Sequence, residues 1–382
     1  MASFLINCSN IRVGGSLQVA DSFCKILDRF QQHQFVVVTS RWLKDTKAAI
    51  SLYTNVYSVE YDMTKGFLAS CIGRDRFLDR LVDEYHIDAV LTVFGPPRWK
   101  PRKPHLCGFA RAHIVFTDSP FWVKLKKKEL IRDKIFYLSL SVLFRLNANS
   151  LWTENPILSP RLKKKYKRKQ IYVVTNCYNQ IFDCQSLWKK NIKLNPFDGV
   201  TIISISVPYR HKNYPLLSGI CEYMEKMYPD FNYRFVLTQT ENQCRYIPEK
   251  YKSRFIFLGQ VEVSQCPYLY EQSDIMFMPT LLECFTATYP EAMRMDVPII
   301  TTDLEFAHGL CGDAACYYSA LDAKAAAKAI YKVATDKEYA KNMVEKGRQQ
   351  LKKYDNYEQR AEKLVQILEM MTINNSRNLL IE

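Results

Sequence analysis

Several features that would place the sequence in a particular class of protein are missing from it. No N-terminal run pairs basic residues with a long apolar stretch, and the longest apolar patch, 135–144, is far shorter than the ~20 residues of a membrane-spanning helix. Neither an internal repeat nor a low-complexity tract is present. We therefore expect a cytoplasmic protein without a secretory leader or a membrane span.

Metal-binding patterns are equally scarce. The sequence has 12 cysteines, yet it contains no Cys-x-x-Cys pair and no Cys/His cluster with zinc-like spacing. An Asp-x-Asp motif is also missing. These absences predict reduced, mostly buried thiols, no metal site and no cofactor.

Positive charge is abundant but unevenly distributed. Residues 98–169 contain 19 Lys or Arg against four Asp or Glu, so this segment holds the whole net charge of +14. Within it, "FWVKLKKKELIRDKIFYLSLSVLF" alternates basic and bulky apolar residues, as segments at a membrane interface do. Three interpretations stay open: a solvated face, contact with anionic lipid, and binding of nucleic acid.

The length of 382 residues and an apolar content of 48% predict two domains with sizeable cores. Strand-like runs alternate with helical patterns, which is typical of parallel sheets covered by helices on both faces. In the first half these runs are 3–9, 35–40, 89–94 and 113–118. The pattern restarts in the second half at 200–206, 233–238, 254–259, 274–279, 297–302 and 315–319.

This alternation predicts an α/β protein with two Rossmann-like doubly wound domains facing across a cleft, at residues 1–175 and 176–354. Open α/β sheets bind ligands beyond the carboxyl ends of their strands. Residues that carry function are therefore expected directly after strands.

One such stretch is "PTLLECFTATYPEAM", residues 279–293. Glu283 follows the strand-like run 274–279, and Pro290 is expected to begin a helix that has Glu291 in its first turn. The two carboxylates would then bracket a helix N-terminus, which favours an anion such as phosphate, and each carboxylate can accept hydrogen bonds from adjacent hydroxyls. The alternative is a structural role, with Glu291 complementing the helix dipole and Glu283 as an ordinary loop residue.

The longer stretch "FMPTLLECFTATYPEAMRMDVPIITTD" resembles the signature of the retaining glycosyltransferases of family four, in which seven residues separate two glutamates. The resemblance is strong over 201–337 and weak in the first half. It implies the two-domain GT-B fold, with the C-terminal helix at 355–382 crossing back to the first domain. It also implies that Glu283 contacts hydroxyls of the donor sugar and that Glu291 contacts the ribose of the nucleotide.

The same resemblance places Lys212 on the diphosphate of the donor. The arginine that relatives carry five residues earlier is replaced by Val207, and Arg210 is the candidate to supply its charge. Cys284 and Thr286 stand where relatives commonly have glycines. The predicted donor-binding residues besides Glu291 are Gly14, Gly15, Gly259, Cys284, Phe285 and Thr286.

Asp118, His105 and Trp122 are predicted on the acceptor side, on loops of the first domain. The resemblance implies metal-independent transfer of a sugar from a nucleoside-diphosphate donor to a saccharide acceptor, without a cofactor. A lipid-linked acceptor fits the basic first domain, and the usual setting is assembly of bacterial capsule, lipopolysaccharide or exopolysaccharide at the inner face of the plasma membrane. A sugar-nucleotide epimerase and a non-enzymatic nucleic-acid binder are the alternatives, although the latter leaves the glutamates and Lys212 unexplained.

Overall fold

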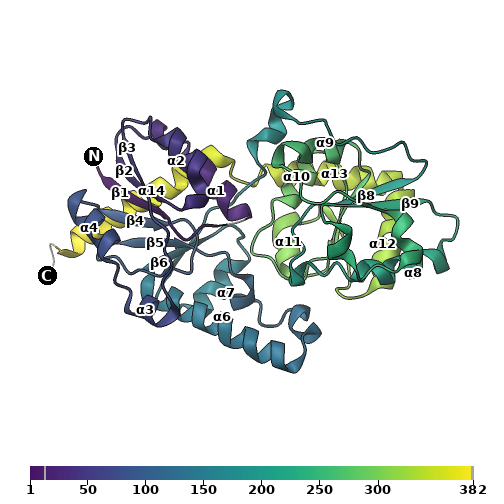
Figure 1. Cartoon of the computed structure of the whole chain (residues 1–382), viewed down its shortest axis with the longest axis horizontal. Helices are drawn as coiled ribbons and strands as arrows, with labels where there is room; N and C mark the ends of the chain where they lie inside the picture. Colours follow the sequence, from purple (N-terminus) through teal and green to yellow (C-terminus); the bar gives the residue numbers. More distant parts are fainter. Residues whose placement is uncertain (13, 380–382) are drawn as a thin grey trace. The chain divides into compact units, whose positions relative to one another are not determined.

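The computed structural model describes residues 1–12 and 14–379, which form two compact units (Figure 1). Unit 1 comprises Met1–Thr117, Leu125–Asn176 and the described residues from Asp355 onward. Unit 2 comprises Cys177–Tyr354 and the short segment Asp118–Lys124, which lies in the range predicted for the first domain.

Unit 1 is built on a seven-stranded sheet in the order β3-β2-β1-β4-β5-β6-β7, in which all neighbouring strands are parallel. The strands are β1 Ser3–Cys8, β2 Gln34–Thr39, β3 Val56–Glu60, β4 Ala89–Thr92, β5 His105–Gly108, β6 Ser150–Thr153 and β7 Gln170–Val173. The α-helices are α1 Gly15–Cys24, α2 Lys44–Ile50, α3 Phe67–Ile72, α4 Arg76–Glu84, α5 Ala112–Val115, α6 Lys127–Asn147, α7 Leu158–Lys165 and α14 Tyr357–Leu379.

The central strands of unit 1 are apolar on both faces because helices cover both sides of the sheet. Phe4 and Ile6 of β1 pack into one buried cluster, whereas Leu5 packs into another cluster on the opposite face. Successive side chains of a strand point to opposite faces, so a strand covered on both sides must be apolar throughout. This requirement explains why β1 and β2 were recognisable from the sequence.

The C-terminal helix α14 belongs to unit 1, where it contacts α1 and β4 (Figure 1). Leu364 and Leu368 are buried in the core of the unit, and the guanidinium of Arg360 donates to Ser22 Oγ at 2.6 Å and to Asn176 Oδ1. The prediction that the last helix returns to the first domain is therefore confirmed.

Unit 2 is built on a six-stranded parallel sheet in the order β10-β9-β8-β11-β12-β13. Its strands are β8 Val200–Ser204, β9 Tyr233–Leu237, β10 Phe255–Phe257, β11 Ile275–Met278, β12 Ile299–Thr302 and β13 Ala315–Tyr318. Its α-helices are α8 Leu216–Met227, α9 Cys266–Glu271, α10 Thr288–Arg294, α11 Glu305–Cys311, α12 Ala323–Thr335 and α13 Lys337–Leu351. All six predicted strands are present, with ends within two residues of the prediction.

One predicted strand of unit 1 is wrong. Residues 113–118 do not form a strand, since His113 lies in the short helix α5, and the strand that pairs with β4 is β5 instead. A Cβ atom at Gly108 would lie 1.9 Å from the carbonyl oxygen of Val93, so glycine permits this close approach of β5 to the end of β4. The β-branched and aromatic residues after 112 have a high strand propensity, but the packing of the sheet overrides it.

The order of strands reverses direction at one point in each sheet. In unit 1, β1 lies between β2 and β4, and in unit 2, β8 lies between β9 and β11. At such a switch point the loops after two adjacent strands diverge and leave a crevice at the carboxyl edge, where doubly wound sheets bind ligands. The loops after β1 and β4, and those after β8 and β11, are therefore the places to look for a site.

Candidate active site

A buried ion pair occupies the switch point of unit 2. Lys212 follows β8, Glu283 follows β11, and Lys212 Nζ lies 2.6 Å from Glu283 Oε1. Both residues are only 7% exposed, and Thr280 Oγ1 donates a second hydrogen bond of 2.8 Å to the same carboxylate oxygen. The backbone joins the two loops, because the N–H of Leu281 donates to the carbonyl oxygen of His211 at 2.8 Å. The structure thus brings together two residues that are 71 positions apart in the sequence and that were predicted to act jointly.

The loop that carries Lys212 also places a histidine that the sequence analysis did not select. His211 Nε2 lies 4.0 Å from Glu283 Oε1, and burial, together with the charge of Lys212, lowers the pKa of His211 to about 3. Its imidazole is therefore neutral at physiological pH. The sequence could have indicated His211 through its position directly before Lys212 in "RHKN". Arg210 starts the same 3-10 turn, is exposed, and has its guanidinium carbon 6.0 Å from the centre of the Phe121 ring.

Glu291 is a second buried carboxylate in unit 2. It is 7% exposed, and its Oε2 accepts one long hydrogen bond of 3.4 Å from the hydroxyl of Tyr270. Burial raises the pKa of Glu291 to about 7, against a smaller opposing effect of the Tyr270 hydrogen bond. The helix that carries it begins at Thr288, so Pro290 is its third residue, and the prediction that Pro290 begins the helix was wrong by two residues.

The loop between the two glutamates has an ordinary backbone. Cys284 and Thr286 are buried, and neither has a positive φ, so replacement of the glycines of relatives does not force a strained conformation. Thr286 Oγ1 donates to Thr288 Oγ1 at 3.2 Å, which fixes its hydroxyl within the loop, and Phe285 is partly buried. Gly259, after β10, has a φ of +71°, a conformation that favours glycine.

Two of the residues predicted on the acceptor side belong to unit 2 instead of unit 1. Asp118 and Trp122 lie in the segment Asp118–Lys124, which packs against the loop that precedes Glu283. Ser119 Oγ donates to the carbonyl oxygen of Leu281 at 2.7 Å, and the segment also donates from Lys124 Nζ to Asn213 Oδ1. Trp122 is buried and Asp118 is exposed. The segment thus adjoins the ion pair, although the sequence placed it in the first domain.

The third predicted acceptor residue, His105, is not on a loop at all. It is the first residue of β5 and is fully buried, with Nδ1 2.7 Å from the carbonyl oxygen of Asn147 and Nε2 2.8 Å from Thr92 Oγ1. Burial lowers the pKa of His105 to about 4, despite the hydrogen bond to Asn147, so the ring is neutral in the core. The prediction that His105 lies on a loop was therefore wrong, because the strand was predicted in the wrong place.

Gly14 and Gly15 begin α1 in unit 1. Gly14 is the N-cap with a φ of +72°, which a residue with a side chain rarely adopts, and a Cβ atom at either glycine would meet nothing within 4 Å. The turn therefore requires glycine at position 14 for its conformation, while the space around both residues is open.

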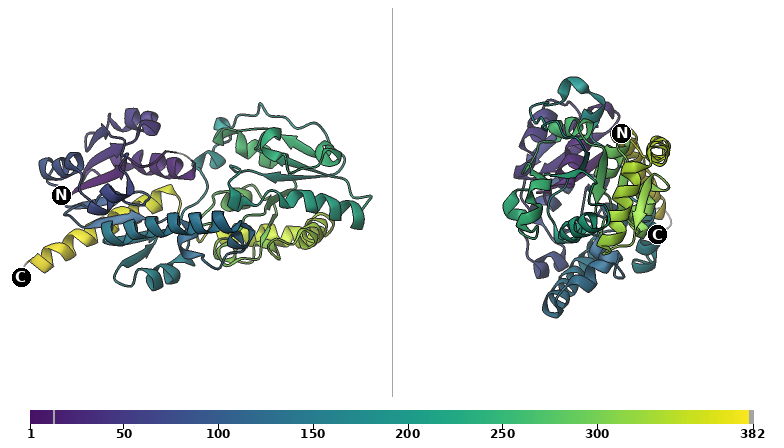
Figure 2. Two further views of the ribbon diagram at one scale, coloured as in Figure 1. Left: turned by 60° about the horizontal axis from the view of Figure 1, so that its bottom comes forward. Right: turned by 90° about the vertical axis from the view of Figure 1, so that its right-hand side faces the viewer.

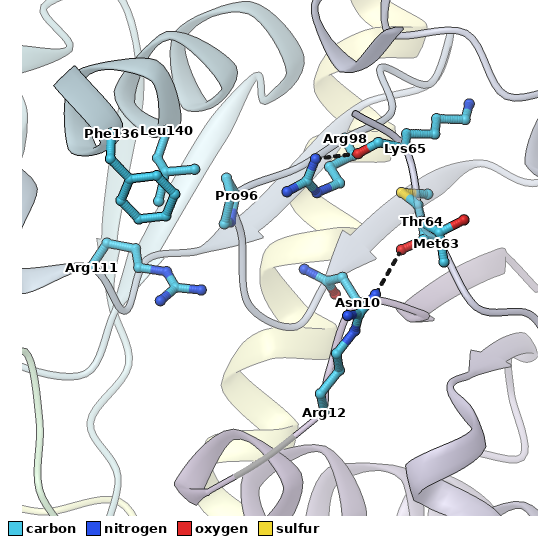
Figure 3. A pocket seen from close by; sticks show the side chains of 10 residues that line it. All are labelled: Asn10, Arg12, Met63, Thr64, Lys65, Pro96, Arg98, Arg111, Phe136 and Leu140. Atoms are coloured by element: carbon cyan, nitrogen blue, oxygen red, sulfur yellow. Dashed lines mark hydrogen bonds between the residues drawn. The ribbon is translucent and has the colours of Figure 1, made fainter. Parts of the chain in front are cut away.

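A basic pocket lies at the switch point of unit 1 (Figure 3). It has a volume of about 470 Å³, and Arg98 Nη1 donates across its wall to the carbonyl oxygen of Lys65 and to Ser70 Oγ at 3.3 Å. Burial and the charges of Arg12 and Arg111 lower the pKa of Arg98. Its lining residues are Asn10, Arg12, Met63, Thr64, Lys65, Pro96, Arg98, Arg111, Phe136 and Leu140. The sequence analysis selected none of these residues, although each of the four basic ones follows a strand of the sheet.

Residues 1–12 and 14–379 contain neither a candidate metal site nor a candidate membrane-spanning helix. Within these ranges, His, Cys, Asp and Glu side chains form no group of three that could hold a metal ion. Over the same part of the chain, no helix combines the length and the apolar character needed to cross a membrane.

Comparison with protein families matches residues 189–350 to a family described as "Glycosyl transferases group 1". The match includes Lys212, Glu283 and Glu291, and it confirms the resemblance inferred from the motif. A comparison with curated protein sequences found no match.

Solved structures with the same fold cover nearly the whole chain. Sucrose-phosphate synthase from Thermosynechococcus elongatus is 13% identical with a TM-score of 0.74, over 98% of this chain and 100% of that one. A UDP-forming trehalose-phosphate synthase from Burkholderia vietnamiensis is 10% identical with a TM-score of 0.65, over 97% and 100%. Anabaena HepE, solved in complex with UDP and glucose, is 10% identical with a TM-score of 0.64, over 97% and 100%. These likenesses confirm the predicted two-domain GT-B fold.

Proposed function

We propose that this chain, whose residues 189–350 match the group 1 glycosyltransferases, moves a sugar, with retention of anomeric configuration, from a nucleoside-diphosphate donor to a saccharide acceptor. The observation that carries the proposal is the buried pair of Lys212 and Glu283 at the switch point of unit 2. It combines a cation for a leaving phosphate with a carboxylate for sugar hydroxyls at one place in the fold.

Lys212 is proposed to stabilise the charge that develops on the leaving diphosphate. A preorganised cation in a site from which water is excluded stabilises such charge far better than a cation in bulk water. Arg210 adds a second positive charge from the same turn, whereas the neutral ring of His211 does not compete for the phosphate. Since these two side chains supply the positive charge, we propose a reaction that needs no divalent metal ion and no cofactor.

Glu283 is proposed to bind the donor sugar and Glu291 the ribose. In the described part of the chain, both hydrogen bonds to the Glu283 carboxylate go to Oε1, so Oε2 is left to accept from a sugar hydroxyl. Among the described residues, Glu291 receives only the long bond from Tyr270, so a ribose hydroxyl would add a donor that the buried carboxylate lacks. Two acceptors of this kind match the hydroxyls of a nucleotide sugar.

The first experiment is thermal stabilisation of the protein by UDP, by GDP and by a single-stranded oligonucleotide. UDP comes first because HepE was solved with UDP and glucose. A ligand at a hundredfold excess over its Kd adds about 2.7 kcal/mol to the unfolding free energy, which is readily detected. Stabilisation by UDP or GDP, but not by the oligonucleotide, supports the proposal. Stabilisation by the oligonucleotide alone, falling steeply with salt, would replace it with a nucleic-acid binder.

A screen of nucleotide sugars then separates transfer from epimerisation. We expect slow release of UDP or GDP from the correct donor, and the product sugar should keep the anomeric configuration of the donor. Conversion of the nucleotide sugar without release of the nucleoside diphosphate would identify an epimerase instead. Inversion of the anomeric centre would contradict retention.

We further propose that unit 1 rests on an anionic membrane through α6, one unbroken helix in Figure 2. Ile131, Ile135 and Leu138 occupy positions i, i+4 and i+7, so they share one face of the helix, and all three are exposed, Ile135 by 63%. Lys128 and Lys134 are spaced to lie on the same face, and each adds about 1 kcal/mol near an anionic leaflet. This charge favours lipid as the occupant and a lipid-linked saccharide of surface polysaccharide assembly, at the cytoplasmic face, as the acceptor.

A further inference from the structure

The basic pocket of unit 1 has an unusual balance of charge. Its lining includes Arg12, Lys65, Arg98 and Arg111 and no acidic residue. Lys65 has an ion pair with Asp75 at 2.8 Å, but no carboxylate in the described part of the chain lies within 4.0 Å of the other three cations. Asp62 is close enough to Arg12 for that charge, acting against desolvation, to help lower the pKa of Asp62, but the pocket still holds more positive than negative charge. Like charges gathered in this way repel one another, so the pocket is prepared for an anion.

The cations reach the pocket from four separate loops. Arg12 follows β1, Lys65 follows β3, Arg98 follows β4 and Arg111 follows β5. Figure 3 shows the side chains of Arg12, Arg98 and Arg111 arranged around one opening. Loops at the carboxyl edge of a doubly wound sheet converge on a ligand at the switch point. A surface that was merely solvated would not require basic side chains from four separate loops.

The remaining wall is apolar. Phe136 and Leu140 of α6, with Pro96, form the side of the pocket next to Arg111 (Figure 3). A volume of about 470 Å³ lies within the range of small-molecule sites. An aromatic ring beside a group of guanidinium ions suits a molecule with one flat, weakly polar part and one strongly anionic part.

We infer that this pocket binds a phosphate group of the sugar acceptor, so that the acceptor is a phosphorylated saccharide. The inference rests on the proposed function, because only a glycosyltransferase has such an acceptor. Guanidinium ions bind phosphate oxygens through paired hydrogen bonds, and several of them match a doubly charged phosphate better than a singly charged carboxylate. The phosphate belongs either to a soluble sugar phosphate or to a lipid-linked sugar phosphate, which share this chemistry.

Binding is tested without a donor, so that the result is independent of catalysis. Calorimetry compares glucose 6-phosphate with glucose and with glucuronate at fixed salt, and flotation compares phosphatidylcholine vesicles with and without a polyprenyl phosphate. Arg111→Gln and Arg98→Gln are the variants, and Lys163→Gln and Lys164→Gln are the controls, which remove the same charge from exposed positions on α7. Arg111 is exposed, so its replacement should not disturb folding even if that of Arg98 does.

We expect each arginine variant to weaken phosphate binding about tenfold or more, as loss of one charge-assisted hydrogen bond does, while the lysine controls change it less than about twofold. Binding of glucose 6-phosphate identifies a soluble acceptor, and binding of the doped vesicles alone identifies a lipid-linked one. Equal losses in variants and controls, equal affinity for glucuronate, or no saturable binding of either phosphate would overturn the inference.

A fifth variant separates this inference from the proposed function. Lys212→Gln removes the cation of unit 2 and leaves the pocket of unit 1 unchanged. If UDP fails to bind wild-type protein while phosphate binding persists and depends on Arg111, the donor assignment is wrong but the anion site stands. If UDP binds and phosphate does not, the anion site is wrong but the donor assignment stands.

Discussion

The switch points of the two units use positive charge in opposite ways. In unit 2 the cation of Lys212 is buried and is neutralised by Glu283 at 2.6 Å, while Arg210 of the same turn is exposed. In unit 1, Arg12, Arg98 and Arg111 surround an open pocket of about 470 Å³, and none of the three has a carboxylate partner within 4.0 Å among the described residues (Figure 3). A paired and buried cation fixes the position of one group with precision, whereas unpaired cations attract an anion with less constraint on its shape. This contrast supports the proposal that the donor phosphate binds to unit 2 and the more variable acceptor to unit 1.

The largest expected effect comes from breaking the pair in unit 2. Lys212→Met should lower turnover by about a hundredfold or more, because it removes a cation aimed at the leaving phosphate. It should also lower the unfolding free energy by about 3 kcal/mol, because Glu283 is left buried without a counter-charge. Steady-state kinetics and urea unfolding measure the two losses separately.

A double variant separates stability from catalysis at the same site. Lys212→Met combined with Glu283→Gln removes both charges, so most of the lost stability should return while turnover stays low. Turnover that recovers together with stability would mean that the pair only holds the fold. Near-normal turnover in Lys212→Met would contradict the catalytic assignment altogether.

A smaller effect is expected from pH, through Glu291. Because its pKa is about 7, the carboxylate that is proposed to accept from ribose is lost as pH falls, and UDP affinity should drop about fivefold from pH 7 to pH 6. In Glu291→Gln the affinity should be lower at pH 8 but independent of pH. Calorimetric titration with UDP from about pH 5.5 to about pH 8 measures the affinity of wild type and of Glu291→Gln at each pH.

Unit 1 supplies the matched control for this titration. Burial raises the pKa of Glu154 to about 7 as well, against the charge of Arg360, yet Glu154 lies in unit 1. Either folded carboxyl keeps a proton that the unfolded chain releases near its ordinary pKa of 4.5, so each lowers the unfolding free energy as pH rises from about 4.5 to 7. Both Gln variants should remove part of that decline. Only Glu291→Gln should change the pH dependence of UDP binding, and the same change in Glu154→Gln would refute a local role for Glu291.

The membrane proposal predicts an effect confined to unit 1. Ile135→Ser and Leu138→Ser should each weaken binding to anionic vesicles by about tenfold, since each removes an apolar side chain from the proposed interface. Their unfolding free energies should stay within about 0.5 kcal/mol of wild type, because both positions are exposed. Leu52→Ser, in the exposed turn after α2, is the matched control, and vesicle binding that falls equally in this variant would exclude α6 as the contact.

More of unit 2 than of unit 1 could be predicted from the sequence. In unit 2 the six strands have only three to five residues but are mostly apolar, and the residues that follow them carry a spaced motif. The sheet and the residues Lys212 and Glu283 could therefore be predicted, although their ion pair could not. In unit 1, β5, β6 and β7 each begin with a polar residue, so their strand pattern is weak. The basic pocket could not be predicted either, because each of its four loops contributes one arginine or lysine without a local pattern. Only the assembled sheet brings them together.

Replacement of His105 should have the smallest effect on activity, and it tests whether this buried residue has any part in binding the acceptor. Because His105 is buried in β5, His105→Gln should leave kcat and the acceptor KM within about twofold of wild type, while loss of its hydrogen bonds lowers the unfolding free energy by about 1 to 3 kcal/mol. The depressed pKa of about 4 means that the unfolded chain binds a proton between pH 6.5 and 4 that folded His105 does not, so wild-type stability falls as pH falls through this window. In His105→Gln the unfolding free energy should depend less on pH in this window. Part of the dependence should remain because His211 of unit 2, whose pKa is about 3, contributes to it in the same way. A large rise in acceptor KM in His105→Gln, with folding intact, would instead return His105 to the acceptor side.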